Sequence, residues 1–104
     1  MAMTSLDMMP KAEEATRLMK ALAHPERLMI CCQLREGELS VGEIEAKLNI
    51  TQPRLSRELS KLRRRNILGT RRKSKSIIYH LKDDRIRAIV DMLCDVMMKE
   101  GQLS

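Results

Sequence analysis

Apolar residues in the first third of the chain recur at helical spacing, in two runs that a proline separates. The first run covers residues 11–23, and Pro10 stands at its start, where a helix tolerates proline. The second run begins at Pro25 and continues to about Arg35. The apolar positions are Ala15, Leu18, Met19 and Leu22 in the first run, and Leu28, Cys31, Cys32 and Leu34 in the second. The pattern therefore predicts two successive helices.

Two further helices are predicted next, over residues 41–48 and from Thr51 to about Arg65. Ser40 and Glu43 have the spacing of a capping box at the start of the first of these helices. Thr51 is expected to cap the second. The inward positions are Ile44 and Leu48 in the first helix and Leu55, Leu59 and Leu62 in the second, where Gln52 and Pro53 occupy the first turn.

The periodicity changes after residue 66. Residues 67–72 and 76–81 are β-prone, and the segment Lys73-Ser74-Lys75 between them predicts a hairpin with a positively charged tip. A last helix is predicted over residues 85–99, with Asp83 or Asp84 as its cap and Ile86, Ile89, Val90, Leu93 and Met97 as its apolar stripe. The expected fold is mainly α with a β-hairpin, in the order α-α-α-α-β-β-α.

The composition fits one small domain. A chain of 104 residues and 12.0 kDa is too short for two independent cores, so we expect a domain over residues 10–99 between flexible tails, residues 1–9 and 100–104. The chain has nine Met but no Phe or Trp, and such a core buries modest area, which makes oligomerisation a plausible supplement. No apolar run approaches the roughly 18 residues that span a bilayer, and the first ten residues do not resemble a signal peptide. We therefore expect a cytoplasmic protein without a membrane partner.

Positive charge is concentrated in one region. Residues 51–76 hold ten of the chain's 20 Lys and Arg residues and a single acid, Glu58. A basic segment of this kind in a small domain points to a polyanion, and nucleic acid is the first candidate.

The two helices around residues 49–51 and the basic hairpin have the arrangement of a winged helix-turn-helix. Gln and Arg near the start of a recognition helix can read adenine and guanine edges, whereas Ser and Lys suit phosphates. A charged helix face that is merely solvated is the alternative, but it does not account for the turn, the cap and the hairpin together. The candidate DNA-binding residues are Gln52, Arg54, Ser56, Arg57, Ser60 and Lys61 on the helix and Arg71, Arg72, Lys73, Lys75 and Tyr79 on the hairpin.

Four segments together resemble an ArsR-type winged-helix repressor, over roughly residues 10–98. They are residues 23–28, 40–44 and 51–59 and the hairpin end at 78–81. The resemblance implies a homodimer built from the first and last helices, with two recognition helices in successive major grooves of a pseudo-palindromic double-stranded DNA operator and an inducer that loosens binding. Relatives often carry His or Gln at the position of Glu58; here we expect an ion pair with Arg54 or Lys61 rather than a contact to cytosine.

The metal sites of the family are missing from this sequence. Residues 41–48 lack the cysteine pair of the arsenic and cadmium sensors, and the last helix contains no histidine. His24 precedes Pro25 at a helix boundary and His80 lies in a predicted strand, so neither is expected to bind metal. We expect no cofactor.

The cysteines are compatible with more than one inducer. The resemblance places Cys32 at the second-helix cysteine of the sulfide- and persulfide-responsive members, whose partner position falls here at Met98, while Cys94 lies one turn earlier, about 5.4 Å along the helix. Cys31 and Cys32 are neighbours and are not expected to bridge. Three interpretations follow. All three cysteines can be buried hydrophobic residues, or Cys32 and Cys94 can form a thiol sensor in which Arg27 and Arg35 lower the pKa of Cys32. Alternatively, the three thiolates can bind arsenite.

Other functional classes have less support. No Gly-rich phosphate loop or set of nucleophile, base and orienting residue is present, so we do not expect an enzyme. A winged helix can also bind protein or RNA, but RNA readers usually stack bases on aromatic side chains, and Tyr79 is the one aromatic residue in the sequence. A footprint on duplex DNA separates these classes.

Overall fold

The computed structural model describes residues 5–103, which form five helices and three strands. In chain order the elements are α1 (Ser5–Leu22), α2 (Pro25–Leu34), β1 (Leu39–Ser40), α3 (Val41–Leu48), α4 (Arg54–Arg64), β2 (Leu68–Lys73), β3 (Ser76–Leu81) and α5 (Asp84–Leu103). This winged helix-turn-helix confirms the predicted fold class, with α4 as the second helix of the motif and β2–β3 as the wing.

Short polar contacts determine where the helices begin. His24 Nδ1 accepts a hydrogen bond from the backbone N–H of Glu26 at 3.2 Å, ahead of α2. The capping box at α3 is present as predicted: the Glu43 N–H donates to Ser40 Oγ at 3.2 Å, and the Ser40 N–H donates to Glu43 Oε1 at 2.9 Å. Asp83 is the cap of α5, because its Oδ1 accepts from the Arg85 N–H at 2.9 Å.

The sheet is antiparallel, with strand order β1-β3-β2. Tyr79 on β3 pairs with Thr70 on β2 and with Leu39 on β1. At the hairpin tip Ser74 has a φ of 58°, a left-handed conformation that a tight turn needs. The two-residue strand β1 was not predicted, because so short a segment carries no periodicity.

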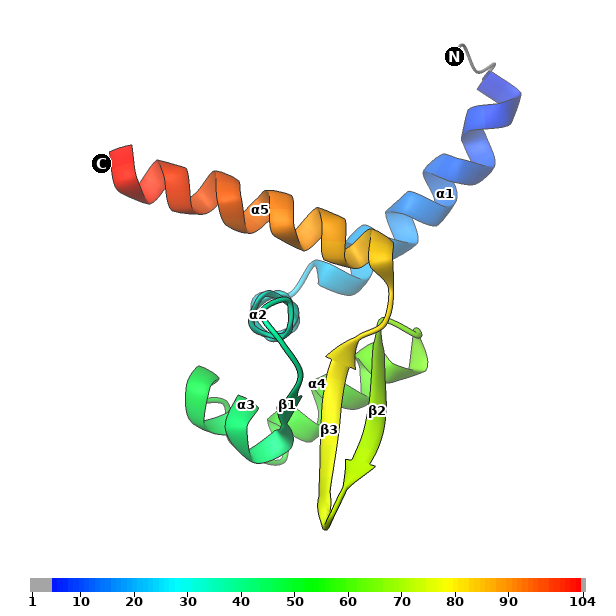
Figure 1. Ribbon diagram of the computed structural model, residues 1–104. Helices are drawn as coiled ribbons and strands as arrows, with labels where there is room; N and C mark the ends of the chain where they lie inside the picture. Colours follow the sequence, from blue (N-terminus) through cyan, green and yellow to red (C-terminus); the bar gives the residue numbers. More distant parts are fainter. Residues whose placement is uncertain (1–4, 104) are drawn as a thin grey trace.

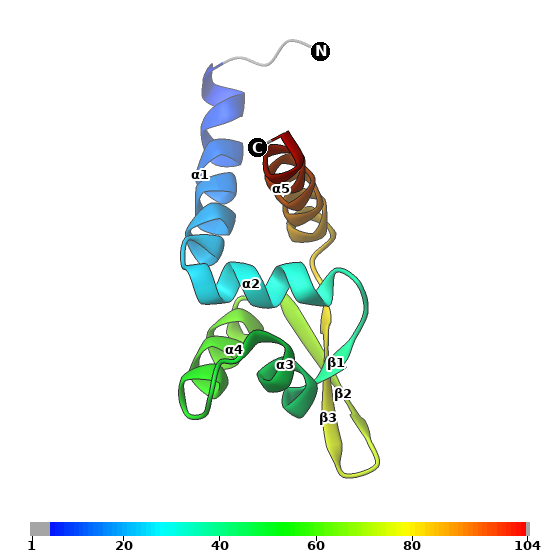
Figure 2. The ribbon, with the colours of Figure 1, turned by 90° about the vertical axis from the view of Figure 1, so that its left-hand side faces the viewer.

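The core surrounds α2, whose Ile30, Cys31 and Leu34 are fully buried. The other buried apolar residues come from every helix and from both strands of the wing: Ala21, Leu22, Ile44, Ile50, Leu55, Leu59, Leu62, Ile67, Leu68, Ile78, Leu81, Ile86 and Val90. Helices α1 and α5 extend from one side of α2, and α3, α4 and the wing lie on the other (Figures 1 and 2). The molecule therefore has two ends joined through α2.

The first and last helices are longer than predicted. Residues 5–9 belong to α1, with Pro10 inside the helix, and α5 continues to Leu103. Leu and Met are good helix formers, and the helix continues across Pro10 although this residue lacks a backbone donor. Residues 1–4 and 104 of the predicted tails lie outside the described residues.

Candidate nucleic-acid interface and thiol pair

Helix α4 has one buried face and one exposed basic face. Leu55, Leu59 and Leu62 are buried against the core, which leaves the opposite side chains in solvent. The exposed residues are Arg54, Ser56, Arg57, Ser60 and Lys61, together with Gln52 just before the helix. The predicted recognition face is therefore on the surface, at the same end of the molecule as the wing (Figure 1).

The start of α4 differs from the prediction. The helix begins at Arg54, and Thr51 contributes its carbonyl oxygen rather than its hydroxyl, accepting from the Leu55 N–H at 3.1 Å. Gln52 supplies the side-chain contact: its Oε1 accepts from the Ser56 N–H at 3.2 Å and also from the Ser56 hydroxyl. The longer side chain of Gln52 reaches across the first turn to Ser56, so Gln52 and Ser56 form one polar pair on the exposed face.

Glu58 lies on the inner side of α4 and is 4% exposed. Its carboxylate contacts Lys61 Nζ at 3.2 Å, Arg27 Nη1 at 3.4 Å and His24 Nδ1 at 3.8 Å. The predicted pair with Lys61 is confirmed and the alternative pair with Arg54 is wrong, because Arg54 points to Glu26 instead. Buried carboxylates need such partners, so Glu58 fixes α4 against α2 and is not presented to a groove.

Arg54 is held by Glu26 on α2. Its Nε donates to Glu26 Oε1 at 3.1 Å, and its Nη2 donates to Glu26 Oε2. The hydrogen bond from Arg54 holds the pKa of Glu26 below its usual value. Glu26 and Arg27 were not predicted as partners of α4, because a contact between helices so far apart in the chain leaves no local pattern.

The wing carries its cations on the surface. Arg71, Arg72, Lys73 and Lys75 are exposed, and Arg71 Nε donates to Glu38 Oε2 at 3.0 Å. Tyr79 is half-buried and packs against the core below the tip. The hairpin thus exposes four predicted DNA-binding residues, whereas Tyr79 is only partly accessible.

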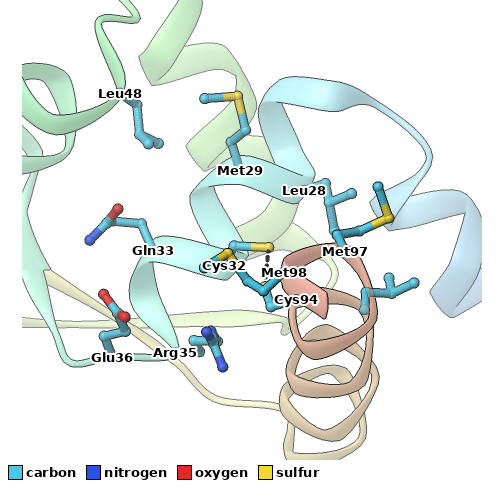
Figure 3. Close-up of a pocket in the computed structure, with 11 residues that line it drawn as sticks. Leu28, Met29, Cys32, Gln33, Arg35, Glu36, Leu48, Cys94, Met97 and Met98 are labelled. Atoms are coloured by element: carbon cyan, nitrogen blue, oxygen red, sulfur yellow. Dashed lines mark hydrogen bonds between the residues drawn. The ribbon is translucent and has the colours of Figure 1, made fainter. Parts of the chain in front are cut away.

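Cys32 and Cys94 lie side by side between α2 and α5 (Figure 3). The Cys94 thiol donates to Cys32 Sγ, and the two sulfur atoms are 2.9 Å apart. Burial raises the pKa of Cys32 to about 12. Arg35 acts to lower this pKa, as expected, but burial outweighs its effect, so the expectation of a lowered pKa is wrong.

Cys31 is separate from this pair. It is 0% exposed and belongs to the core, and burial raises its pKa to about 12. The adjacent residues Cys31 and Cys32 point in different directions on α2, as neighbours on a helix do. The three thiols therefore do not form one cluster, and in residues 5–103 no group of three or more His, Cys, Asp or Glu residues is placed to hold a metal ion.

A groove of about 390 Å³ opens beside the thiol pair (Figure 3). One side of it is apolar and the other carries polar groups. Its lining residues are Leu28, Met29, Leu48, Leu93, Met97 and Met98, then Gln33, Arg35 and Glu36, with Cys32 and Cys94. A small molecule can therefore approach the sulfur atoms from solvent.

Comparison with known proteins places this architecture in a family. The protein-family model described as "Bacterial regulatory protein, arsR family" matches residues 24–69, from the cap of α2 to β2. The Biofilm growth-associated repressor of Agrobacterium fabrum is 49% identical over 83 residues, which cover 80% of this chain and 71% of that protein. The chain belongs to the arsR family.

Other members of the arsR family are similar along most of their length. The crystal structure of the transcriptional repressor BigR from Xylella fastidiosa has a TM-score of 0.83 and 45% identity, covering 90% of this chain and 96% of that chain. The Transcriptional activator HlyU of Vibrio cholerae is 36% identical over 87 residues, covering 84% of this chain and 81% of that protein. This chain is therefore a DNA-binding transcriptional regulator with the winged helix-turn-helix of its family.

Within the part of the chain that the structure describes, no helix of this arsR-family protein is long and apolar enough to cross a bilayer.

Proposed function

We propose that this protein is a homodimeric repressor that leaves its operator when Cys32 and Cys94 react with a reactive sulfur species or an oxidant. The observation that carries the proposal is the 2.9 Å separation of the two sulfur atoms, one on α2 and one on α5. A disulfide needs a shorter separation still, so a bridge draws α2 and α5 together. Helix α2 also carries Arg27, which contacts α4 through Glu58. Oxidation at one end of α2 therefore affects the recognition helix at the other.

The chemistry uses a polysulfide as oxidant. The Cys32 thiolate attacks one sulfur of an organic polysulfide and expels the remainder as a thiolate or persulfide anion. The Cys94 thiolate then attacks the sulfur of Cys32, and the transferred fragment leaves in turn as an anion. One S–S bond forms between the cysteines, two thiol protons are released, and the polysulfide is reduced by two electrons.

Exposed apolar side chains support the dimer. They gather on the two helices that extend away from the wing: Met8, Met9 and Met19 on α1 and Met92, Val96, Met97 and Met98 on α5. Exposed apolar side chains that gather on one end of a molecule are typical of an interface, and a two-fold axis there turns both α4 helices toward the same DNA duplex. Half-sites then lie about 34–36 Å apart on the DNA.

The test is DNA binding by fluorescence anisotropy, on promoter fragments and after treatment with reductant, organic polysulfide, peroxide, arsenite or zinc. Polysulfide should release the protein and produce a Cys32–Cys94 crosslink in the mass spectrum. The Cys32→Ser variant should bind DNA and no longer release it, whereas Cys31→Ala, the matched control, should keep the response. The regulated reporter gene should be transcribed more after release.

Three outcomes contradict the proposal. Unchanged affinity and no crosslink after polysulfide or peroxide mean that the cysteines only pack. Release by arsenite that requires Cys31 points to a three-thiolate ion site. Binding to single-stranded RNA in preference to duplex DNA points to an RNA module.

A further inference from the structure

The guanidinium group of Arg54 is fixed before any DNA is present. Arg54 is the first residue of α4 and its side chain is 62% exposed, whereas the side chain of Glu26 is only 16% exposed. The carboxylate of Glu26 binds two nitrogen atoms of Arg54, Nε and Nη2, along one edge of the planar group. A bidentate pair of this kind fixes the orientation of the guanidinium as well as its position.

The edge that Glu26 leaves open is the one that suits guanine. A guanidinium group has five N–H donors, and Glu26 uses one on Nε and one on Nη2. The remaining edge presents one N–H from Nη1 and one from Nη2, parallel to each other. Within residues 5–103 no hydrogen-bond acceptor contacts Nη1 of Arg54. Two parallel donors match O6 and N7 of guanine in the major groove.

Glu26 is itself held firmly. Its backbone N–H donates to His24 Nδ1 at 3.2 Å. The next residue, Arg27, donates to the Ala21 carbonyl at 2.7 Å and contacts Glu58 on α4 at 3.4 Å. The first turn of α2 is therefore tied to α1 and to α4, so the carboxylate of Glu26 keeps its place relative to the recognition helix.

We propose that Glu26 is a specificity-determining positioning residue, which orients Arg54 so that its open edge reads one guanine in each half-site. The inference rests on the proposed function, because it requires α4 to lie in the major groove. A negative charge next to Arg54 also disfavours a phosphate as its partner, and an arginine that is already oriented loses less side-chain freedom on binding. Arg54 thus contributes to base preference rather than to general affinity.

The experiment is selection from a randomised duplex library, followed by affinity measurements on duplexes that differ at one base pair. Wild-type protein should prefer guanine at one position of each half-site. Glu26→Gln removes the charge and one of the two acceptors, and should lower that preference about tenfold or more, as expected for a bidentate contact. Arg54→Lys, which lacks the planar edge, should lower it as much, and Glu26→Gln should have no further effect on preference in that background.

The wing provides a matched control. Glu38 binds Arg71 through the same two nitrogen atoms, Nε and Nη2, but on β2 rather than on α4. Glu38→Gln makes the same change in charge, and should leave the guanine preference as it is while altering affinity equally for all sequences.

The outcomes separate this inference from the proposed function. If wild-type protein has no sequence preference on duplex DNA, the proposed function fails. If it is specific but Arg54→Lys keeps the guanine preference, only the inference fails. If Glu26→Gln strengthens binding to all duplexes equally and keeps the preference, as expected for Glu38→Gln, Glu26 acts as a repulsive charge and the inference is wrong.

Discussion

Ion pairs of different burial determine which single residues stabilise this protein. Arg27 and Glu58 have side-chain exposures of 15% and 5%, whereas Arg35 and Asp91 are 25% and 49% exposed. An exposed ion pair adds little to the stability of the fold, because water and salt screen the attraction between its charges. A buried carboxylate that loses a partner remains desolvated, and the full cost of its burial then lowers the free energy of unfolding.

Arg27→Met should therefore lower the free energy of unfolding by about 3–5 kcal/mol, since Glu58 would keep only the more exposed Lys61 as a cationic partner. Arg35→Met is the matched control and should cost less than about 1 kcal/mol. Urea unfolding at one fixed protein concentration measures both variants. Equal losses would show that burial of Glu58 is not what makes Arg27 important.

Cys32 should react slowly near neutral pH and faster in alkali. Its pKa is raised to about 12 by burial, so the thiolate fraction rises about tenfold per pH unit up to that value. The rate of exchange with an uncharged disulfide reagent should rise in the same way from pH 7 to 10, without a plateau. In denaturant the rate should level off near the ordinary pKa of a thiol. A plateau near pH 7 in the folded protein would contradict the raised pKa.

The same shift affects stability. The folded protein holds the proton of Cys32 more tightly than the unfolded chain does, so the unfolded chain loses protons first as the pH rises above about 9. Cys32 therefore leaves the free energy of unfolding unchanged below about pH 9, and lowers it progressively between about pH 9 and about pH 12.

At the scale of elements, helix starts depend on a few side chains. The box formed by Ser40 and Glu43 supplies both reciprocal hydrogen bonds at α3. Ser40→Ala should cost about 1 kcal/mol of unfolding free energy. Ser60→Ala, on the exposed face of α4, should stay within about 0.5 kcal/mol. Thermal denaturation compares the two, and an equal loss would mean that the box contributes nothing.

The elements that sequence analysis predicted correctly are those with local signals. Periodic leucines such as Leu55 and Leu59 predict α4, and the Ser40 spacing predicts the start of α3. Thr51 has the residue type of a cap, but Gln52 performs the side-chain contact because its reach is longer. Strand β1 exists only through pairing with β3, a partner distant in sequence.

The thiol pair shows the same division between local and long-range signals. The position of Cys94 on its helix follows from the sequence, but its distance from Cys32 depends on how α5 crosses α2. The offset of one turn from the expected position did not keep the sulfur atoms apart. Glu26 and Glu38 were missed for the same reason, since each contacts an arginine on another element.

At the scale of the whole molecule, the dimer is the main expectation. Val96 on α5 is 53% exposed, so a charge there should leave the protomer folded. Val96→Glu should give a monomer at micromolar concentration, because an unpaired carboxylate would be buried in the interface. Ala46→Glu, on the exposed side of α3, is the control and should remain dimeric. Light scattering measures the mass and circular dichroism the helix content; a dimeric Val96→Glu variant would place the interface elsewhere.

The position of Tyr79 has a spectroscopic consequence. The chain has no Trp and no other Tyr, so its intrinsic ultraviolet fluorescence comes from one ring on β3, paired with Leu39 and Thr70. Emission from unlabelled protein therefore reports the wing alone. Docking on DNA should change its intensity, whereas association through α1 and α5, at the opposite end of the molecule, should leave it unchanged. A titration of unlabelled protein therefore distinguishes DNA binding from association of protomers, two events that usually need separate labels.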